Sequence, residues 1–169
     1  TQESNLGKNV GTCNRPGDPP EKGWKMIMKP TRDQEPFLAI TTDLGRNPDI
    51  TPVSCPMKNR DGSQLGWGGA MGPAQFIPST WVLYKNRIGD ATRDAPPNPY
   101  DARDAIFATA LLMADNGADL QTHTAERKAA LKYFAGANWA KRAYAFYGDD
   151  VMEFAADFQG DIDILEGRS

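Results

Sequence analysis

A glycine-rich stretch in the middle of the chain has the residue types of a small polar binding site. Residues 68–81 read GGAMGPAQFIPSTW, and their first half fits neither a strand nor a helix. The glycines let backbone approach a ligand closely, and Met71, Phe76 and Ile77 supply apolar walls. Gln75 offers two donors and an acceptor, which suits the amide of an N-acetylated sugar. A structural loop with a capping amide explains the same composition.

Two shorter stretches carry further candidate side chains. In QESNLG, Glu3 and Ser4 precede Gly7, where we expect a helix to stop. A glutamate near a helix C-terminus is mildly unfavourable against the helix dipole, which hints at a function, although a solvated glutamate is the simpler interpretation. In KYFAGANW, Tyr133 lies near the end of a helix that stops at Gly136, and a core tyrosine is the simpler interpretation there.

Together these stretches resemble the three motifs of the lytic transglycosylases, which cleave the glycan strands of bacterial peptidoglycan on a lysozyme-like fold. The ES pair at 3–4 resembles the first motif, GPAQ at 72–75 the second, and YFAG at 133–136 the third. The run 68–81 is similar to that of the membrane-bound B-type branch and its secreted relatives. Residues 98–117 resemble the helix between the second and third motifs.

The chain departs from the family pattern in two places. Phe134 stands where the third motif has an asparagine, which puts a polar role at that position in doubt. Residues 8–52 form a long insertion, in which we expect a loop and one helix.

The resemblance implies cleavage of the MurNAc-β-1,4-GlcNAc bond with formation of 1,6-anhydroMurNAc. It implies that Glu3 is the sole catalytic acid and base, since the sugar's own acetamido group replaces the second carboxylate that most glycosidases use. The side chains expected to contact or orient the substrate are Ser4, Met71, Gln75, Tyr133 and Trp67. The resemblance implies no cofactor, no metal, and a monomer that meets peptidoglycan outside the cytoplasm, in the periplasm, the cell envelope or secreted.

Two other functions fit the same motifs. A hydrolytic muramidase of the goose-lysozyme type would need another carboxylate to activate water, and Asp18 and Asp61 lie in loops that could approach. A non-catalytic peptidoglycan-binding module would retain sacculi without releasing fragments. Anhydro-muropeptides would indicate transglycosylation, and reducing ends would indicate hydrolysis.

Length and charge set the broad class. The 169 residues suit one domain, and the sequence pattern predicts a mainly α architecture with long ordered loops. The resemblance implies that this architecture is lysozyme-like. A formal net charge of −3 without a basic run argues against nucleic-acid binding. The longest apolar run, residues 105–114, is too short for a bilayer-spanning helix, which needs about 20 residues. Because the chain begins at Thr1, we expect that an upstream segment, with any secretion signal, has been removed.

The chain has two cysteines, Cys13 and Cys55, and both lie in loop-like sequence. A disulfide is favoured over two free thiols, although spacing alone leaves both open. With His123 as the only histidine, a zinc site is not expected.

Capping residues and apolar periodicity predict the helices. One is expected over 31–44, with Thr31 as N-cap and Gly45 beyond its end, although Pro36 favours a later start. A second begins at Pro78 and ends at Gly89. The others are a central helix from Asp101 to Gly117, one from a cap at Thr124 to Gly136, and one or two over 138–158.

Overall fold

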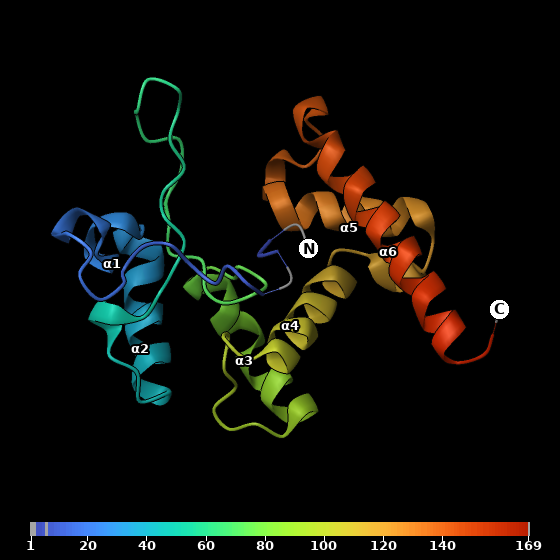
Figure 1. Ribbon diagram of the computed structural model, residues 1–169, viewed down its shortest axis with the longest axis horizontal. Helices are drawn as coiled ribbons and strands as arrows, with labels where there is room; N and C mark the ends of the chain where they lie inside the picture. The colour runs from blue at the N-terminus through green and yellow to red at the C-terminus, as the bar shows by residue number, and fades with distance from the viewer. Residues whose placement is uncertain (1–2, 6, 169) are drawn as a thin grey trace. The chain divides into compact units, whose positions relative to one another are not determined.

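The computed structural model describes residues 3–5 and 7–168, and it is mainly helical. No β-strand occurs in these residues, only the isolated antiparallel bridges Cys13–Val53, Lys58–Gln64 and Met71–Phe76. The prediction of a mainly α chain is therefore confirmed. The backbone groups into two compact units, one over 3–109 and one over 110–169 (Figure 1).

The first unit begins with short helical turns that pack against one longer helix. After η1 (Pro20–Lys22) come α1 (Trp24–Ile27), the π-helical turn η2 (Pro30–Gln34) and α2 (Glu35–Asp43). The rings of Trp24 and Phe37 lie 5.8 Å apart between centroids, and both side chains are buried. This contact gives the inserted residues a core of their own.

The predicted helix over 31–44 is correct at its C-terminal end and wrong at its N-terminal end. Residues 30–34 wind as a π-helical turn, so Thr31 is not an N-cap, and the α-helix begins at Glu35 with Pro36 in its first turn. Gly45 follows the helix at φ +62°, where its N–H donates to the Thr42 carbonyl.

Helix α3 (Pro78–Thr92) begins at the predicted proline but has no side-chain cap within its own sequence, because Ile77 occupies the N-cap position. The buried carboxylate of Asp33 supplies one, since its Oδ1 accepts from Ser79 Oγ at 2.8 Å and more weakly from Ser79 N at 3.4 Å. The helix does not end at Gly89 as predicted. It continues to Thr92 and stops where Arg93 adopts φ +62°.

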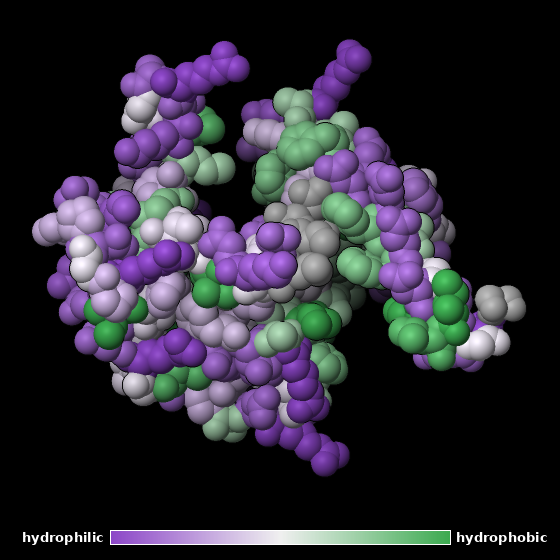
Figure 2. All heavy atoms as spheres, viewed as in Figure 1, coloured by the Kyte–Doolittle hydropathy of each residue, from purple (hydrophilic) through white to green (hydrophobic). Residues whose placement is uncertain are grey.

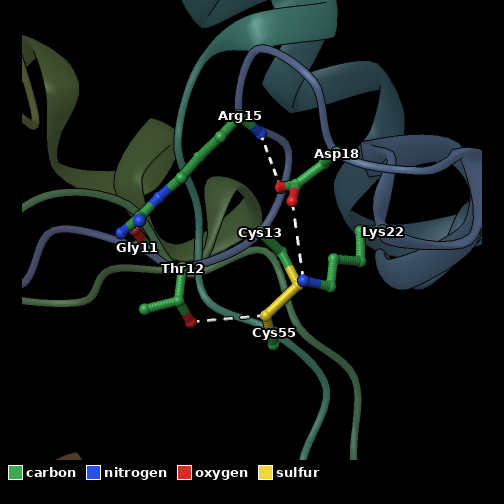
Figure 3. A network of polar contacts seen from close by, with 7 residues as sticks. All are labelled: Gly11, Thr12, Cys13, Arg15, Asp18, Lys22 and Cys55. Carbon is green, nitrogen blue, oxygen red and sulfur yellow. Dashed lines mark hydrogen bonds and ion pairs between the residues drawn. A yellow bond between two sulfur atoms is a disulfide. The ribbon is translucent and has the colours of Figure 1, made fainter.

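A disulfide joins Cys13 to Cys55, which confirms the favoured prediction. Around it, Arg15 donates to the Gly11 carbonyl, and Asp18 accepts from the Arg15 backbone N–H at 2.9 Å (Figure 3). Asn14 is buried nearby, where its side chain donates to the carbonyls of Pro48 and Thr51 and accepts from Trp24 N. The disulfide and these hydrogen bonds therefore anchor the segment 8–52 within the first unit.

Helix α4 (Ala102–Asp115) runs across the point where the two units divide. Its predicted start is confirmed, because Asp101 Oδ1 accepts from the N–H groups of Arg103 and Asp104. The prediction that α4 is buried on nearly all sides is wrong, because much of its surface is exposed. The buried residues on it are Asp104, Ala105 and Ala108, whereas Ile106 is 69% exposed.

The second unit is a helical hairpin with short turns at its ends. It contains η4 (Ala118–Leu120), α5 (His123–Ala135), η5 (Gly136–Asn138), η6 (Arg142–Tyr144) and α6 (Ala145–Leu165). The N-cap of α5 is Thr122 rather than the predicted Thr124, since Thr122 Oγ1 accepts from Ala125 N at 3.3 Å. The end at Gly136 is as predicted. Arg127 on α5 bonds to Asp149 on α6 at 2.7 Å and ties the two helices together.

Candidate functional site

Residues 71–76 form a tight turn that bends Gln75 back on its own backbone. We call this segment the glutamine turn. Met71 N donates to the Phe76 carbonyl at 2.9 Å and closes it. Inside, the backbone N–H and the side-chain Nε2 of Gln75 both donate to the Gly72 carbonyl, at 3.2 and 2.7 Å. Gln75 itself adopts φ +55°, a conformation that is unusual outside glycine and that often marks a functional site.

Only glycine fits at position 72. Its φ is +66°, and a Cβ there would overlap the carbonyl oxygen of Pro99 and lie 2.7 Å from that residue's carbonyl carbon. The close approach holds the glutamine turn against the loop before α4. Proximity of two backbones is therefore the physical reason for a glycine at position 72.

The side chains around the turn form its apolar walls. Met71, Phe76 and Trp81 are each at least 96% buried, and the rings of Phe76 and Trp81 meet edge to face at 5.9 Å. Gln75, in the same turn, has intermediate exposure.

The N-terminal stretch lies beside this turn. Residues 3–5 form a turn in which Ser4 is 95% buried, with its Oγ accepting from Gly7 N at 3.0 Å and its carbonyl from Asn9 N at 2.9 Å. A Cβ placed on Gly7 would lie 3.6 Å from Pro73 Cβ, at van der Waals distance. The Glu3 turn and the glutamine turn, far apart in the sequence, are therefore neighbours within one unit. Glu3 is half-buried.

Trp67 precedes the glycine run and is 43% exposed, so part of its ring is open to solvent. The glycines after it are held on two sides. Gly68 N donates to the Ile27 carbonyl at 2.9 Å, and Gly69 N donates to the Ser54 carbonyl at 2.9 Å. Ser54 also accepts from Ala70 N through its hydroxyl. The segment 8–52, through Ile27, thus supports the loop that leads into the glutamine turn.

Tyr133 belongs to the second unit, where it is half-buried near the end of α5. The neighbouring Phe134 stacks on Tyr147 at 4.5 Å, nearly parallel, and meets the rings of Tyr144 and Phe146 edge to face. Phe134 therefore belongs to an aromatic cluster within the second unit.

Two other carboxylates considered from the sequence are held in their charged form. The Arg15 backbone N–H and the Lys22 ammonium keep the pKa of Asp18 below its usual value. The hydroxyl and N–H of Ser63 do the same for the pKa of Asp61. A general acid needs a raised pKa, so neither carboxyl is suited to donate a proton near neutral pH.

The sequence did not identify Asp33 as a residue that supports the site. Its carboxylate is fully buried, is paired with Arg32 at 2.6 Å, and caps the helix that follows the glutamine turn. One signal was available: α3 begins after Ile77 without Ser, Thr, Asn or Asp at its N-cap, so the cap must come from elsewhere in the chain.

No group of three or more potential metal ligands occurs in residues 3–5 and 7–168. No helix among them is long and apolar enough to cross a bilayer. The chain matches no protein family, no curated protein and no solved structure.

Proposed function

We propose that the protein is a peptidoglycan lytic transglycosylase that cleaves the MurNAc-β-1,4-GlcNAc bond. The observation that carries the proposal is the contact between Gly7 and Pro73, which brings the Glu3 turn beside the glutamine turn in one unit. The turns that carry the Glu3 carboxyl group and the Gln75 amide then lie beside each other, and Met71 and Phe76 are buried at the two ends of the glutamine turn.

The amide of Gln75 suits recognition of an N-acetyl group. One of its N–H bonds is used within the turn, on the Gly72 carbonyl. The second N–H and the oxygen match the carbonyl and the N–H of an acetamido group. Trp67, with 43% of its surface exposed, offers an aromatic face to a pyranose ring.

In the proposed reaction, protonated Glu3 donates its proton to the glycosidic oxygen as the bond to the anomeric carbon breaks. The acetamido oxygen of the same sugar attacks that carbon and forms an oxazolinium ion. The Glu3 carboxylate then takes the proton of the C6 hydroxyl, whose oxygen attacks the anomeric carbon and closes the 1,6-anhydro ring. No water is consumed, so one carboxyl suffices where most glycosidases use two.

The other proposed residues act around this carboxyl. Ser4 uses its hydroxyl to hold the Glu3 turn, so we assign it to positioning of the glutamate. Tyr133 lies in the second unit, and its contact with the substrate stays a prediction of the resemblance to the third motif. We assign Met71, which is 99% buried, to the wall behind the sugar site.

The test is product analysis with the whole chain on purified sacculi. We expect anhydro-muropeptides by mass spectrometry, and loss of about 10²–10⁴-fold in rate for Glu3→Gln, as for removal of a positioned general acid. Glu21→Gln, at an exposed glutamate of the same unit, is the matched control and should keep full activity.

Each rival function has its own result in this assay. Products with reducing ends would identify a muramidase, for which Asp18 and Asp61 are the carboxylates to substitute next. Retention on sacculi without soluble fragments would identify a non-catalytic binding module. A fully active Glu3→Gln protein would overturn the assignment of the general acid.

A further inference from the structure

Residues 56–67 form a hairpin loop, which we call the arm, that projects from the first unit (Figure 1). Lys58 and Gln64 pair across it, Asn59 N donates to the Ser63 carbonyl at 2.8 Å, and Leu65 N donates to the Met57 carbonyl at 2.8 Å. The arm therefore has a defined antiparallel register.

The tip of the arm is also ordered by local bonds. Asp61 accepts from the Ser63 hydroxyl at 2.6 Å and from its N–H at 2.9 Å, and Gly62 adopts φ +85° between them. A hairpin with this much internal bonding presents its side chains in a fixed pattern. The arm therefore presents an ordered surface.

The side chains of the arm contribute little to the core. Met57 is 60% exposed and Leu65 is 63% exposed, although the register places them opposite each other on one face. A two-stranded hairpin with exposed side chains is only marginally stable by itself. Figure 2 shows hydrophilic residues over the outer part of the arm and apolar ones nearer its base. Because these side chains do not contribute to a core, we attribute their exposure to a role in binding a ligand.

The charge of the arm is opposite to that of the whole chain. The chain has a net charge of −3, whereas the arm carries Lys58 and Arg60 against the single carboxylate of Asp61. Within residues 3–5 and 7–168, neither Lys58 nor Arg60 forms an ion pair. The Asp61 carboxylate accepts a hydrogen bond from the Ser63 hydroxyl. The arm therefore presents positive charge to an acidic ligand.

The place of the arm in the chain connects it to the proposed site. It ends at Trp67 and leads into Gly68 and Gly69, whose N–H groups are bound to the backbone of Ile27 and Ser54. The base of the arm is thereby fixed relative to the glutamine turn, which starts two residues later. A polymer lying along the turn can extend toward the arm.

We propose that the arm binds the acidic peptide stems of the glycan strand and directs the enzyme to peptide-bearing strands in preference to stripped ones. This inference rests on the proposed transglycosylase function, because it takes peptidoglycan as the substrate. The stems carry free carboxylates, which complement Lys58 and Arg60. Exposed apolar side chains at Met57 and Leu65 suit the methyl groups of stem alanines.

The test compares two substrates, sacculi with intact peptides and glycan strands from which an amidase has removed them. For the double variant Lys58→Gln/Arg60→Gln, we expect a rise of about three- to tenfold in half-saturation on peptide-bearing strands, as for two exposed charge pairs. On stripped strands its half-saturation should equal that of the wild type. Added salt should remove the wild type's preference, because exposed charges are screened.

The matched control is Lys29→Gln/Arg103→Gln, which removes the same charge from exposed positions of the first unit outside the arm. It should leave both substrates unaffected. An arm variant with unchanged kinetics on peptide-bearing strands, or with equal losses on both substrates, overturns the inference about the arm. Failure of the wild type to release fragments from stripped strands and from sacculi alike overturns the proposed function instead.

Discussion

The clearest structural test of the glutamine turn is the substitution Gly72→Ala. Two effects add at this position. An alanine at φ +66° pays the strain of the left-handed region, about 1–2 kcal/mol. Its Cβ would also overlap the carbonyl group of Pro99. Because a backbone carbonyl cannot move aside as a flexible side chain can, the two backbone segments must separate, and we expect this to cost about 1–3 kcal/mol more.

A matched glycine separates the two effects. Gly17 has φ +84°, and nothing lies within 4 Å of a Cβ placed on it. Gly17→Ala therefore carries the conformational strain alone, and we expect it to lower the free energy of unfolding by about 1–2 kcal/mol. Gly72→Ala should lower it by about 2–5 kcal/mol in total.

Urea unfolding followed by tryptophan fluorescence measures both variants, with the difference read from the midpoints at constant slope. Activity on sacculi should fall with Gly72→Ala and stay at the wild-type level with Gly17→Ala, since only the former displaces the glutamine turn. Equal destabilisation by the two substitutions would refute the reasoning, because it would mean that the backbones at 72 and 99 are not in close contact.

Three further predictions concern the scaffold. Reduction of the disulfide between Cys13 and Cys55, which are 42 residues apart in the sequence, should lower the free energy of unfolding by about 4 kcal/mol. A melting temperature that reductant leaves unchanged would contradict this. Asp33→Ala should destabilise the protein by about 1–2 kcal/mol, measured by urea unfolding, because α3 loses its side-chain cap, whereas the Arg32 side chain left behind is 40% exposed and can be solvated. The pKa of Asp149 is lowered by its bond to Arg127, so this contribution to stability is present above the usual Asp value of 3.8 and is lost as the pH falls through the lowered pKa. Arg127→Gln should therefore reduce the melting temperature at pH 7 and leave it nearly unchanged at pH 2, and an equal reduction at both would contradict the assignment.

Local signals in the sequence predicted those helix ends that depend on a single residue type. Pro78 begins α3, Asp101 caps α4, and Gly136 ends α5, because fixed φ, a short acceptor side chain and φ > 0 are properties of the residues themselves. One error occurred where equivalent residues compete. Thr122 and Thr124 are equally good caps by type, and the structure uses Thr122.

The support of the candidate site was harder to predict than its residues. Gln75 and Gly72 were recognisable from their surroundings in the sequence. Asp33 was not, because its partner Ser79 lies on another helix and the interaction becomes visible only when the two are brought together. The same holds for the insertion, whose Ile27 carbonyl holds Gly68.

By itself, the order of residues determined the helical class, the main helix ends and the turn-forming character of 71–76, since these depend on backbone preferences of neighbouring residues. Tertiary structure alone decided that the Glu3 turn lies beside Pro73, that Gly72 meets the backbone at 99, and that a buried carboxylate caps α3. The physical reason is that these contacts join segments far apart in the chain, and their energies depend on distances that no local preference sets.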